Sequence, residues 1–302
     1  MSKVSKIAES SNPRVSAVEM TKETLSSRGG LVLFSKYLTT IGVVEVLAQE
    51  FGFLRKSCKG LRLTELFKQI LCFFFDGTAL CMSRFDQLQK DEGYAGVIES
   101  RQAELLSSHQ AKRFFKAFGL LVSAGIFRQI LRRIFVWRLK IEQPSVVELT
   151  IDSMVMNNDD AEQRHGVSPT YKKVKGFQPL HVIWEDRIVD AVFRGGKKNG
   201  NSGNTVANTL REFEKVIREE YSEKVPIIVR FDAGFFDQDI FKVCDELGIG
   251  FICTGKMYDD VKAAVQPIPE ADWKLYKNSH QTWRYAEWEY SAKSWKERSY
   301  RA

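Results

Sequence analysis

The sequence predicts an α/β protein in which an all-helical N-terminal domain precedes a core built on a mixed β-sheet. Apolar residues recur at helical spacing through much of residues 30–141. Gln143-Pro144 ends this pattern, and short runs rich in β-branched residues begin after it. Further along, helical patterns alternate with apolar, strand-like runs, which is the order of parallel strands joined by crossover helices.

The composition is that of an ordinary globular chain, and 302 residues are enough for two domains. The 44% of hydrophobic and 27% of charged residues exclude a mostly disordered, collagen-like or polytopic membrane protein. No apolar run approaches the ~20 residues that a membrane span needs, and the first thirty residues lack the apolar part of a signal peptide. The five cysteines show no CxxC spacing, so we expect neither a disulfide scaffold nor a zinc ribbon, and a cytoplasmic location.

The N-terminal region divides into a polar segment and a helical domain. Residues 1–29 are rich in Ser, Lys, Glu and Thr and are expected to be flexible. Residues 30–143 are expected to form a helical, basic, DNA-binding domain. Ser107 or Ser108 is the expected N-cap of a helix that carries Phe114 and Phe118, and residues 126–138 form the clearest amphipathic segment. We interpret the aromatic stripes of these helices as core.

Charge is distributed unevenly in the helical domain. Between Leu105 and Ile141 there is no Asp or Glu, while the same segment carries eight Lys and Arg residues. Such a run is typical of a surface that faces a polyanion; the alternative is a solvated face balanced by acids elsewhere in the fold. We favour nucleic acid. The candidate contacts in this segment are Lys112, Arg113, Lys116, Arg128, Arg132 and Arg133.

The third region, residues 144–257, has the element order of a ribonuclease-H-like core. That order is β-β-β-α-β-α-β, a meander followed by parallel strands with crossover helices. A flavodoxin-like fold would need a helix directly after the first strand, and none fits between residues 158 and 176. The expected elements are strands at 146–156, 179–185, 187–194, 226–234 and 250–255, with helices at 205–221 and 236–247.

Two aspartates occupy notable places in this core. Asp152 lies in the first strand, within ELTIDSMVM, and Asp232 lies at the end of the fourth, within IIVRFDAGFFD. The first and fourth strands of this topology are neighbours, so the two carboxylates can approach each other. A divalent cation removes the cost of bringing two carboxylates together, and Mg²⁺ prefers such oxygen ligands. The alternative is that Asp152 caps a turn and Asp232 starts a loop.

These motifs resemble those of DDE-type insertion-sequence transposases. The likeness rests on Asp152 in TIDS, the Lys-Gly-Phe-Gln-Pro-Leu run at 175–180, the glycine-rich loop at 194–204 and Asp232 in VRFDAGF. It extends from about Gly30 onward, and it is to the branch whose last catalytic carboxylate lies in a Tyr-x2-Arg-x3-Glu-x6-Lys signature. The resemblance implies a ribonuclease-H-like catalytic domain in which Asp152 and Asp232 are the first two catalytic and metal-binding residues.

The resemblance also implies cofactors, partners and a location. The complete active site of such an enzyme takes two Mg²⁺ ions, for which Mn²⁺ can substitute, and cleaves and rejoins transposon ends. The implied partners are the terminal inverted repeats, target DNA and a second copy of the chain, in the nucleoid-associated bacterial cytoplasm. Further candidates for DNA-backbone contact flank the predicted hairpin and the loop after it: Lys172, Lys173, Lys175, Arg194, Lys197 and Lys198.

The third catalytic carboxylate of the family has no match in this sequence. No Tyr satisfies the signature; the nearest miss starts at Tyr290, with Lys293 in the Arg position and Glu297 in the Glu position. Residues 258–302 alternate aromatic and polar residues, and we interpret them as the start of a β-rich insertion. We therefore expect a C-terminally truncated transposase that is inactive as this fragment because its last catalytic Glu is missing. Glu287, Glu289 and Glu297 are the candidate stand-ins for that Glu.

Two alternatives remain open from the sequence. One is a DNA-binding remnant without catalysis, acting as an inhibitor of intact transposase, which the missing Glu favours. The other is a hydrolytic ribonuclease-H-like nuclease, which a complete four-carboxylate site would support.

Overall fold

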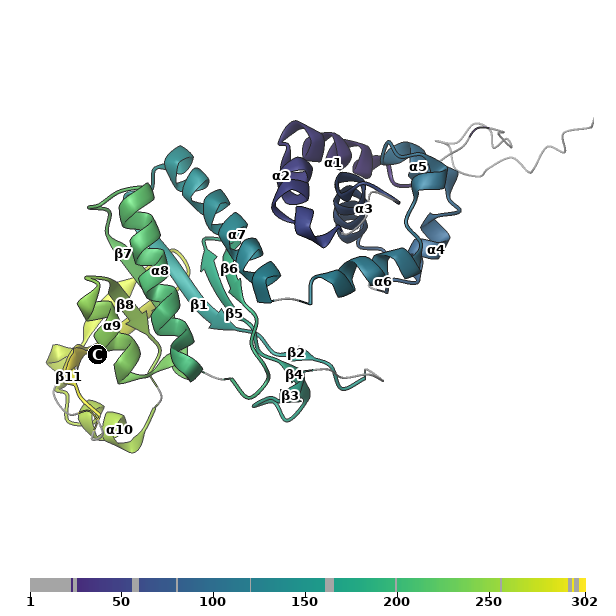
Figure 1. Cartoon of the computed structure of the whole chain (residues 1–302). Coiled ribbons are helices and arrows are strands. Elements are labelled where there is room, and N and C mark those ends of the chain that lie inside the picture. Colours follow the sequence, from purple (N-terminus) through teal and green to yellow (C-terminus); the bar gives the residue numbers. More distant parts are fainter. Residues whose placement is uncertain are drawn as a thin grey trace, which may run out of the picture. The chain divides into compact units, whose positions relative to one another are not determined.

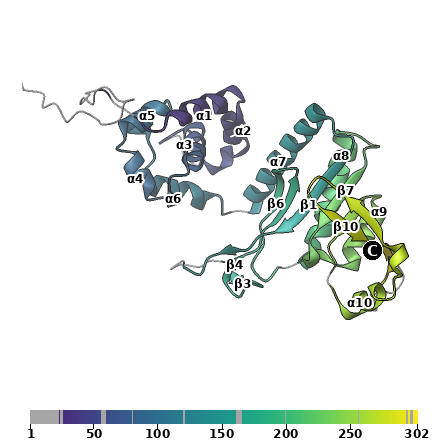
Figure 2. The ribbon, with the colours of Figure 1, turned by 180° about the vertical axis from the view of Figure 1, so that it is seen from behind.

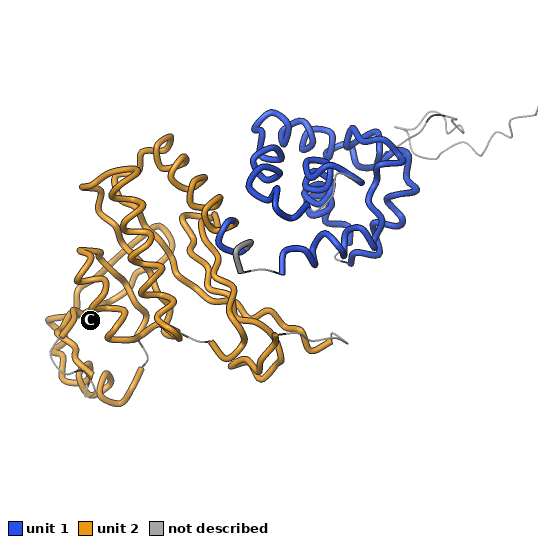
Figure 3. The backbone as a smooth tube through the Cα atoms, viewed as in Figure 1, with its two compact units in different colours: residues 1–126 blue, residues 127–302 orange. Residues whose placement is uncertain are grey.

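The structure, a computed structural model, forms two compact units, Met1–Ile126 and Phe127–Ala302 (Figure 3). It describes residues 23, 26–55, 60–79, 81–119, 121–160, 166–198, 200–255, 257–292, 295 and 299–302. The expected flexible segment 1–29 therefore lies almost wholly outside the described residues, as does Glu297. The division at residue 126 falls inside a helix and differs from the sequence-based boundary at 143.

The first unit is helical, as the sequence predicts. Its helices are α1 (Gly29–Thr40), α2 (Val43–Glu50), α3 (Leu63–Asp76), α4 (Arg84–Leu88), α5 (Glu92–Val97) and α6 (Ser108–Ala117), with 3-10 turns at Gly52–Leu54 and Gln102–Glu104. Phe51, Phe67 and Phe114 are buried and contact one another or a shared neighbour, so the aromatic stripes form core, as expected. Ser107 caps α6, since its hydroxyl accepts the N–H of Gln110 and the Gln110 side chain accepts the N–H of Ser107.

The second unit contains a five-stranded sheet in the order β6-β5-β1-β7-β8 (Figures 1 and 2). Its strands are β1 (Val147–Ser153), β5 (Leu180–Trp184), β6 (Arg187–Val192), β7 (Ile227–Phe231) and β8 (Gly250–Cys253). β1, β5 and β6 form an antiparallel meander, while β7 runs parallel to β1 and β8 parallel to β7. This order is that of a ribonuclease-H-like core, so the predicted fold class is confirmed.

Helices α7 (Leu121–Glu142), α8 (Thr205–Glu220) and α9 (Gln238–Glu246) pack on one face of this sheet (Figure 1). Phe135 and Leu139 of α7 join Leu149 of β1 and Phe213 of α8 in one buried cluster. Of the apolar stripe expected at 126–138, Phe135 packs on the sheet and Ile130 is buried, whereas Phe127 and Ile134 are exposed. This packing explains why the unit boundary falls before Phe127 rather than after the helix.

Two further groups of strands flank the five-stranded sheet. Between β1 and β5, a small sheet in the order β2-β4-β3 is formed by β2 (Met156–Asn157), β3 (Ser168–Pro169) and β4 (Lys175–Phe177). The C-terminal part forms two antiparallel pairs, as expected: β9 (Lys274–Lys277) with β10 (Thr282–Tyr285), and β11 (Glu289–Tyr290) with β12 (Tyr300–Arg301). It also forms a short helix, α10 (Asp259–Val265), that the sequence pattern did not indicate.

The apolar stretches of the described helices are short. None of them alone is long and apolar enough to cross a bilayer, and only the bent pair α1 and α2 passes that test when taken together.

Candidate active site

Asp152 and Asp232 lie at the same edge of the five-stranded sheet. The parallel register of β1 and β7 pairs Leu149 with Val229 and ends with Ile151 opposite Phe231. Asp152 and Asp232 are the next residues of the two strands, so they meet at the carboxyl ends of adjacent parallel strands. Ligands of open α/β sheets bind at this edge.

The two aspartates also share one face of the sheet. Burial alternates along both strands: Ile151 and Phe231 face the helices, while Asp152 and Asp232 are exposed on the opposite face. Side chains of these strands meet across that face, since Arg230 donates to Glu148 at 3.0 Å. Asp232 follows Arg230 by two residues and Asp152 follows Glu148 by four, so both aspartates lie on the face of this ion pair.

Each carboxylate accepts one local backbone hydrogen bond. Asp152 Oδ1 accepts the N–H of Ser153 at 2.6 Å, and Asp232 Oδ1 accepts the N–H of Gly234 at 2.9 Å. Asp232 is thus the N-cap of a 3-10 turn, Ala233–Phe235, so the capping role considered from sequence is present as well. The second oxygen of each carboxylate has no protein partner within the described part of the chain.

The donor set fits a divalent cation of the Mg²⁺ type. Mg²⁺ is commonly held by one or two carboxylates and keeps water in its other positions. Two exposed carboxylates on one face, each with an oxygen to offer, meet this requirement. Over the described residues, no third His, Cys, Asp or Glu joins them in a metal-holding group.

Several residues that the sequence analysis did not assign to the site lie around Asp152. His181 of β5 pairs with Asp152 in the antiparallel register and lies half-buried on the same face. Gln178 is 3% exposed and donates from Nε2 to the Ser153 hydroxyl at 3.2 Å. A two-residue hairpin turn at Glu185-Asp186 connects β5 and β6, whereas the pairing of β5 with β1 places His181 opposite Asp152. Pairing between strands that are distant in the chain leaves no pattern in the local sequence.

Five of the predicted DNA-contact residues gather on the small sheet and the loop beside it. Lys172 and Lys173 lie in the turn between β3 and β4, and Lys175 begins β4. Lys197 and Lys198 follow Gly195, which forms a bridge to Phe177 of β4. All five lysines are exposed. We call Lys172, Lys173, Lys175, Lys197 and Lys198 the lysine platform; β4 leads from it directly to Gln178, beside the aspartates.

Gly176 and Gly196 allow the close packing that supports the platform. A Cβ on Gly196 would lie 2.2 Å from the Ser168 carbonyl oxygen and 2.8 Å from that of Gly176. A Cβ on Gly176 would lie 2.1 Å from the carbonyl oxygen of Met156. Because backbone atoms occupy the space of a side chain, only glycine fits at either position.

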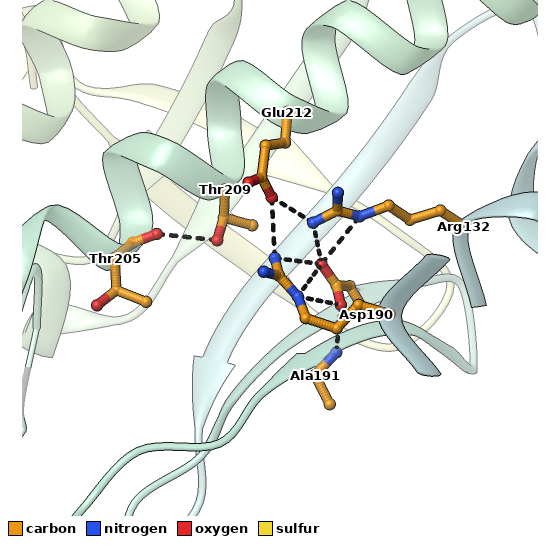
Figure 4. A network of polar contacts seen from close by, with 7 residues as sticks. Arg132, Asp190, Ala191, Thr205, Thr209 and Glu212 are labelled. Carbon is orange, nitrogen blue, oxygen red and sulfur yellow. Dashed lines mark hydrogen bonds and ion pairs between the residues drawn. The ribbon is translucent and has the colours of Figure 1, made fainter. Parts of the chain in front are cut away.

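Other predicted contact residues use their hydrogen bonds inside the protein. Arg128 and Arg132 of α7 both bind the buried carboxylate of Asp190 on β6 and that of Glu212 on α8 (Figure 4). Arg194 is 5% exposed and donates to two backbone carbonyls. The expectation that these three arginines hold DNA phosphates assumed a free surface, whereas the fold assigns them internal partners.

The other predicted contacts lie on helices. Lys112, Arg113 and Lys116 are exposed on α6, opposite buried Ala111 and Phe114. Arg133 is exposed on α7. These four side chains are exposed, as a contact with a polyanion requires.

The candidate stand-ins for a third carboxylate lie in the C-terminal part. Glu287 forms ion pairs with Lys274 and Arg301, which also hold its pKa below the ordinary value. Glu289 lies on β11 and is exposed. Neither belongs to a metal-holding group with the aspartates within the described ranges.

A family model described as transposase DDE domain group 1 matches residues 8–300. No curated protein matches the chain.

Among solved structures, the chain is similar to the piggyBac transposase in a synaptic complex with hairpin DNA, at 13% identity and a TM-score of 0.34 over 76% of this chain and 51% of that one. It is also similar to the Mos1 mariner transposase in a paired-end complex with Mn, at 11% identity and a TM-score of 0.26 over 80% and 85% of the two chains. The chain thus spans about half the length of the piggyBac protein.

Proposed function

Because the chain belongs to the DDE-domain transposase family, we propose that it cuts and joins DNA at the ends of a mobile element, with Asp152 and Asp232 holding the divalent cation. The observation that carries this proposal is the register of β1 and β7, whose last pair, Ile151–Phe231, directly precedes the two aspartates. Their exposure on one face leaves the pair accessible to a phosphodiester.

The protein's own residues supply two things to this reaction. The aspartates provide oxygen ligands at a fixed spacing, because each is attached to a strand of the same sheet. The lysine platform offers positive charge to the phosphates of the strand that enters the site. When bound, Mg²⁺ supplies charge stabilisation for the attacking and leaving oxygens of an in-line displacement at phosphorus.

DNA contact is the second part of the proposal. The exposed basic residues of α6 and the lysine platform are assigned to backbone phosphates, which are bound without regard to sequence. Arg128, Arg132 and Arg194 are assigned to the protein interior instead, because their partners are carboxylates and carbonyls of the same chain. Binding that depends on phosphates weakens steeply with salt.

The test is nicking of supercoiled plasmid DNA in the presence of Mg²⁺ or Mn²⁺. Any nicking by the natural chain, which the absence of a third carboxylate beside the pair in the described residues should make weak, is expected to be lost in Asp152→Asn and in Asp232→Asn. Glu148→Gln is the matched control, since Glu148 lies on the same strand and the same face, four residues earlier; it should nick as the natural chain does. Nicking that persists in both aspartate variants would contradict the assignment. DNA binding without any nicking would favour the alternative of a binding protein without catalysis, which the grouping of only two carboxylates supports.

A further inference from the structure

Arg194 carries a buried positive charge without an acidic partner among the described residues. It follows β6 and is 5% exposed. Its Nε donates to the carbonyl of Gln178 at 3.0 Å and its Nη1 to the carbonyl of Gly200 at 2.9 Å, while Nη2 has no partner. Burial lowers the pKa of this guanidinium from its ordinary value. A buried charge of this kind costs free energy, so its place in the fold calls for an explanation.

On one side, contacts from Arg194 lead to Asp152. Arg194 and Gln178 bond reciprocally, since the N–H of Gln178 also donates to the Arg194 carbonyl at 2.9 Å. The Gln178 side chain then donates to the hydroxyl of Ser153, at 3.2 Å. Ser153 directly follows Asp152 and gives that carboxylate its backbone hydrogen bond. Arg194 thus supports the peptide that holds the first aspartate.

On the other side, contacts lead to Asp232. The Gly200 residue that accepts from Arg194 lies against Gly234: a Cβ on Gly200 would be 3.0 Å from the Gly234 carbonyl oxygen. The N–H of Gly234 is the donor to Asp232 Oδ1. A single guanidinium therefore contacts Gln178 and Gly200, and each of these two residues contacts the segment that orients one of the carboxylates.

We propose that Arg194 is a positioning residue that sets the two aspartates relative to each other, an inference that rests on the proposed function of the pair. The guanidinium suits this task because its donors are held in a rigid plane and reach two carbonyls from different segments at once. A lysine carries the same charge on a flexible stem and lacks this geometry. The negative charge that two carboxylates and a phosphodiester bring to this edge gives the buried cation a compensating environment during the reaction.

The experiment measures Mn²⁺ binding by electron paramagnetic resonance in the full chain. Arg194→Met should weaken binding about tenfold or more, the usual effect of removing a residue that orients a metal ligand. Arg194→Lys should recover only part of this loss. Ser153→Ala, which removes only the last contact on the Asp152 side, should weaken binding by a smaller factor. Lys215→Met, on the exposed face of α8, is the control and should bind Mn²⁺ as the natural chain does.

Parallel measurements on Asp152→Asn and Asp232→Asn separate the two proposals. If these variants lose Mn²⁺ and Arg194→Met and Arg194→Lys both bind normally, the positioning role is overturned and the metal site stands. Full recovery in Arg194→Lys would show that charge alone matters and would also overturn it.

If the aspartate variants bind as the natural chain does, the metal assignment fails, and hydrogen exchange decides the role of Arg194. Faster exchange at the amides of Ser153 and Gly234 in Arg194→Lys would support the bracing of both segments, and unchanged exchange would contradict it. Should Arg194→Met fail to fold, the lysine and Ser153→Ala variants carry the test.

Discussion

Arg128 donates to both carboxylate oxygens of Asp190, from Nε to Oδ1 at 2.9 Å and from Nη2 to Oδ2 at 2.8 Å. Asp190 is fully buried, and Arg132 binds the same carboxylate at 2.8 Å. Although burial lowers the pKa of Arg128, its bonds to Asp190 and Glu212 raise it above the ordinary value overall. This cluster attaches α7 to β6 and α8, so it fixes how the helix lies on the sheet.

Replacing Asp190 should therefore destabilise the second unit strongly. Asp190→Ala leaves two partly buried guanidinium groups without their shared carboxylate, and removal of one partner of such a pair costs about 3 kcal/mol or more. The free energy of unfolding by urea measures this loss. Asp186→Ala is the control, because Asp186 is an exposed turn residue paired with Arg187 at 3.6 Å; its cost should stay below about 1 kcal/mol. Equal costs for the two variants would contradict the structural role of the cluster.

The sequence predicted what depends on local patterns. The element order of the core, the helical first unit and the Ser107 cap each follow from spacing or a short motif, and the structure confirms them. The placement of Asp152 and Asp232 on neighbouring strands was predictable from the topology, but the sequence put Asp152 in the middle of its strand, whereas β1 ends at Ser153.

The rest depends on pairings between distant residues. Asp190 lies 62 residues from Arg128, and the sequence gives no sign that these charges meet. The absence of acids in residues 105–141 indicated an exposed basic surface, whereas part of that charge neutralises Asp190 and Glu212. Likewise Arg194 reads as a surface cation in a glycine-rich loop, and only the packing of that loop against β4 buries it.

The close packing at Gly176 makes a sharp prediction. Gly176→Ala places a Cβ within 2.1 Å of the Met156 carbonyl oxygen, so the small sheet must shift, at a cost of about 1–3 kcal/mol. Thermal melting measures it. Gly250→Ala in β8 is the matched control, because its new Cβ would meet Ile228 at an ordinary 3.5 Å; its melting temperature should not fall. A neutral Gly176→Ala would show that the small sheet does not pack in this way.

The lysine platform should contribute to DNA affinity through phosphates alone. Replacing Lys172 and Lys173 together by Ala should weaken binding equally for unrelated duplexes and reduce the slope of log affinity against log salt by up to about two. Fluorescence anisotropy over a series of salt concentrations measures both effects. The control replaces Lys215 on α8 and Lys224 after α8, both exposed, by Ala. It tests whether the loss of any two positive charges changes the slope equally. An equal change of slope in both double variants would rule out a local contact.

The N-cap of α6 is a test of the first unit alone. Ser107→Ala removes the hydroxyl that accepts the Gln110 N–H, and such a loss costs about 1 kcal/mol. Urea unfolding followed by helical circular dichroism measures it. Ser83 precedes α4 without a side-chain bond to that helix's backbone, so Ser83→Ala should cost less. A cost at Ser107 no larger than at Ser83 would contradict the capping box.

In the absence of metal, the natural chain should be less stable than variants that lack one carboxylate of the aspartate pair. Asp152 and Asp232 are like charges at neighbouring strand ends, and like charges placed opposite each other destabilise a sheet by roughly 0.2–1 kcal/mol. Asp152→Asn and Asp232→Asn should therefore raise the melting temperature in EDTA.

Mg²⁺ should raise the melting temperature of the natural chain, because a ligand that binds only the folded state stabilises that state. The same variants should lose this second rise, since one of the two ligands is gone. Glu148→Gln, which breaks an exposed ion pair on the same face, should melt as the natural chain does, both in EDTA and with Mg²⁺. If the aspartate variants melt lower in EDTA than the natural chain, the carboxylates stabilise the fold as caps. Such a result would contradict the repulsion between the two carboxylates on which this prediction rests.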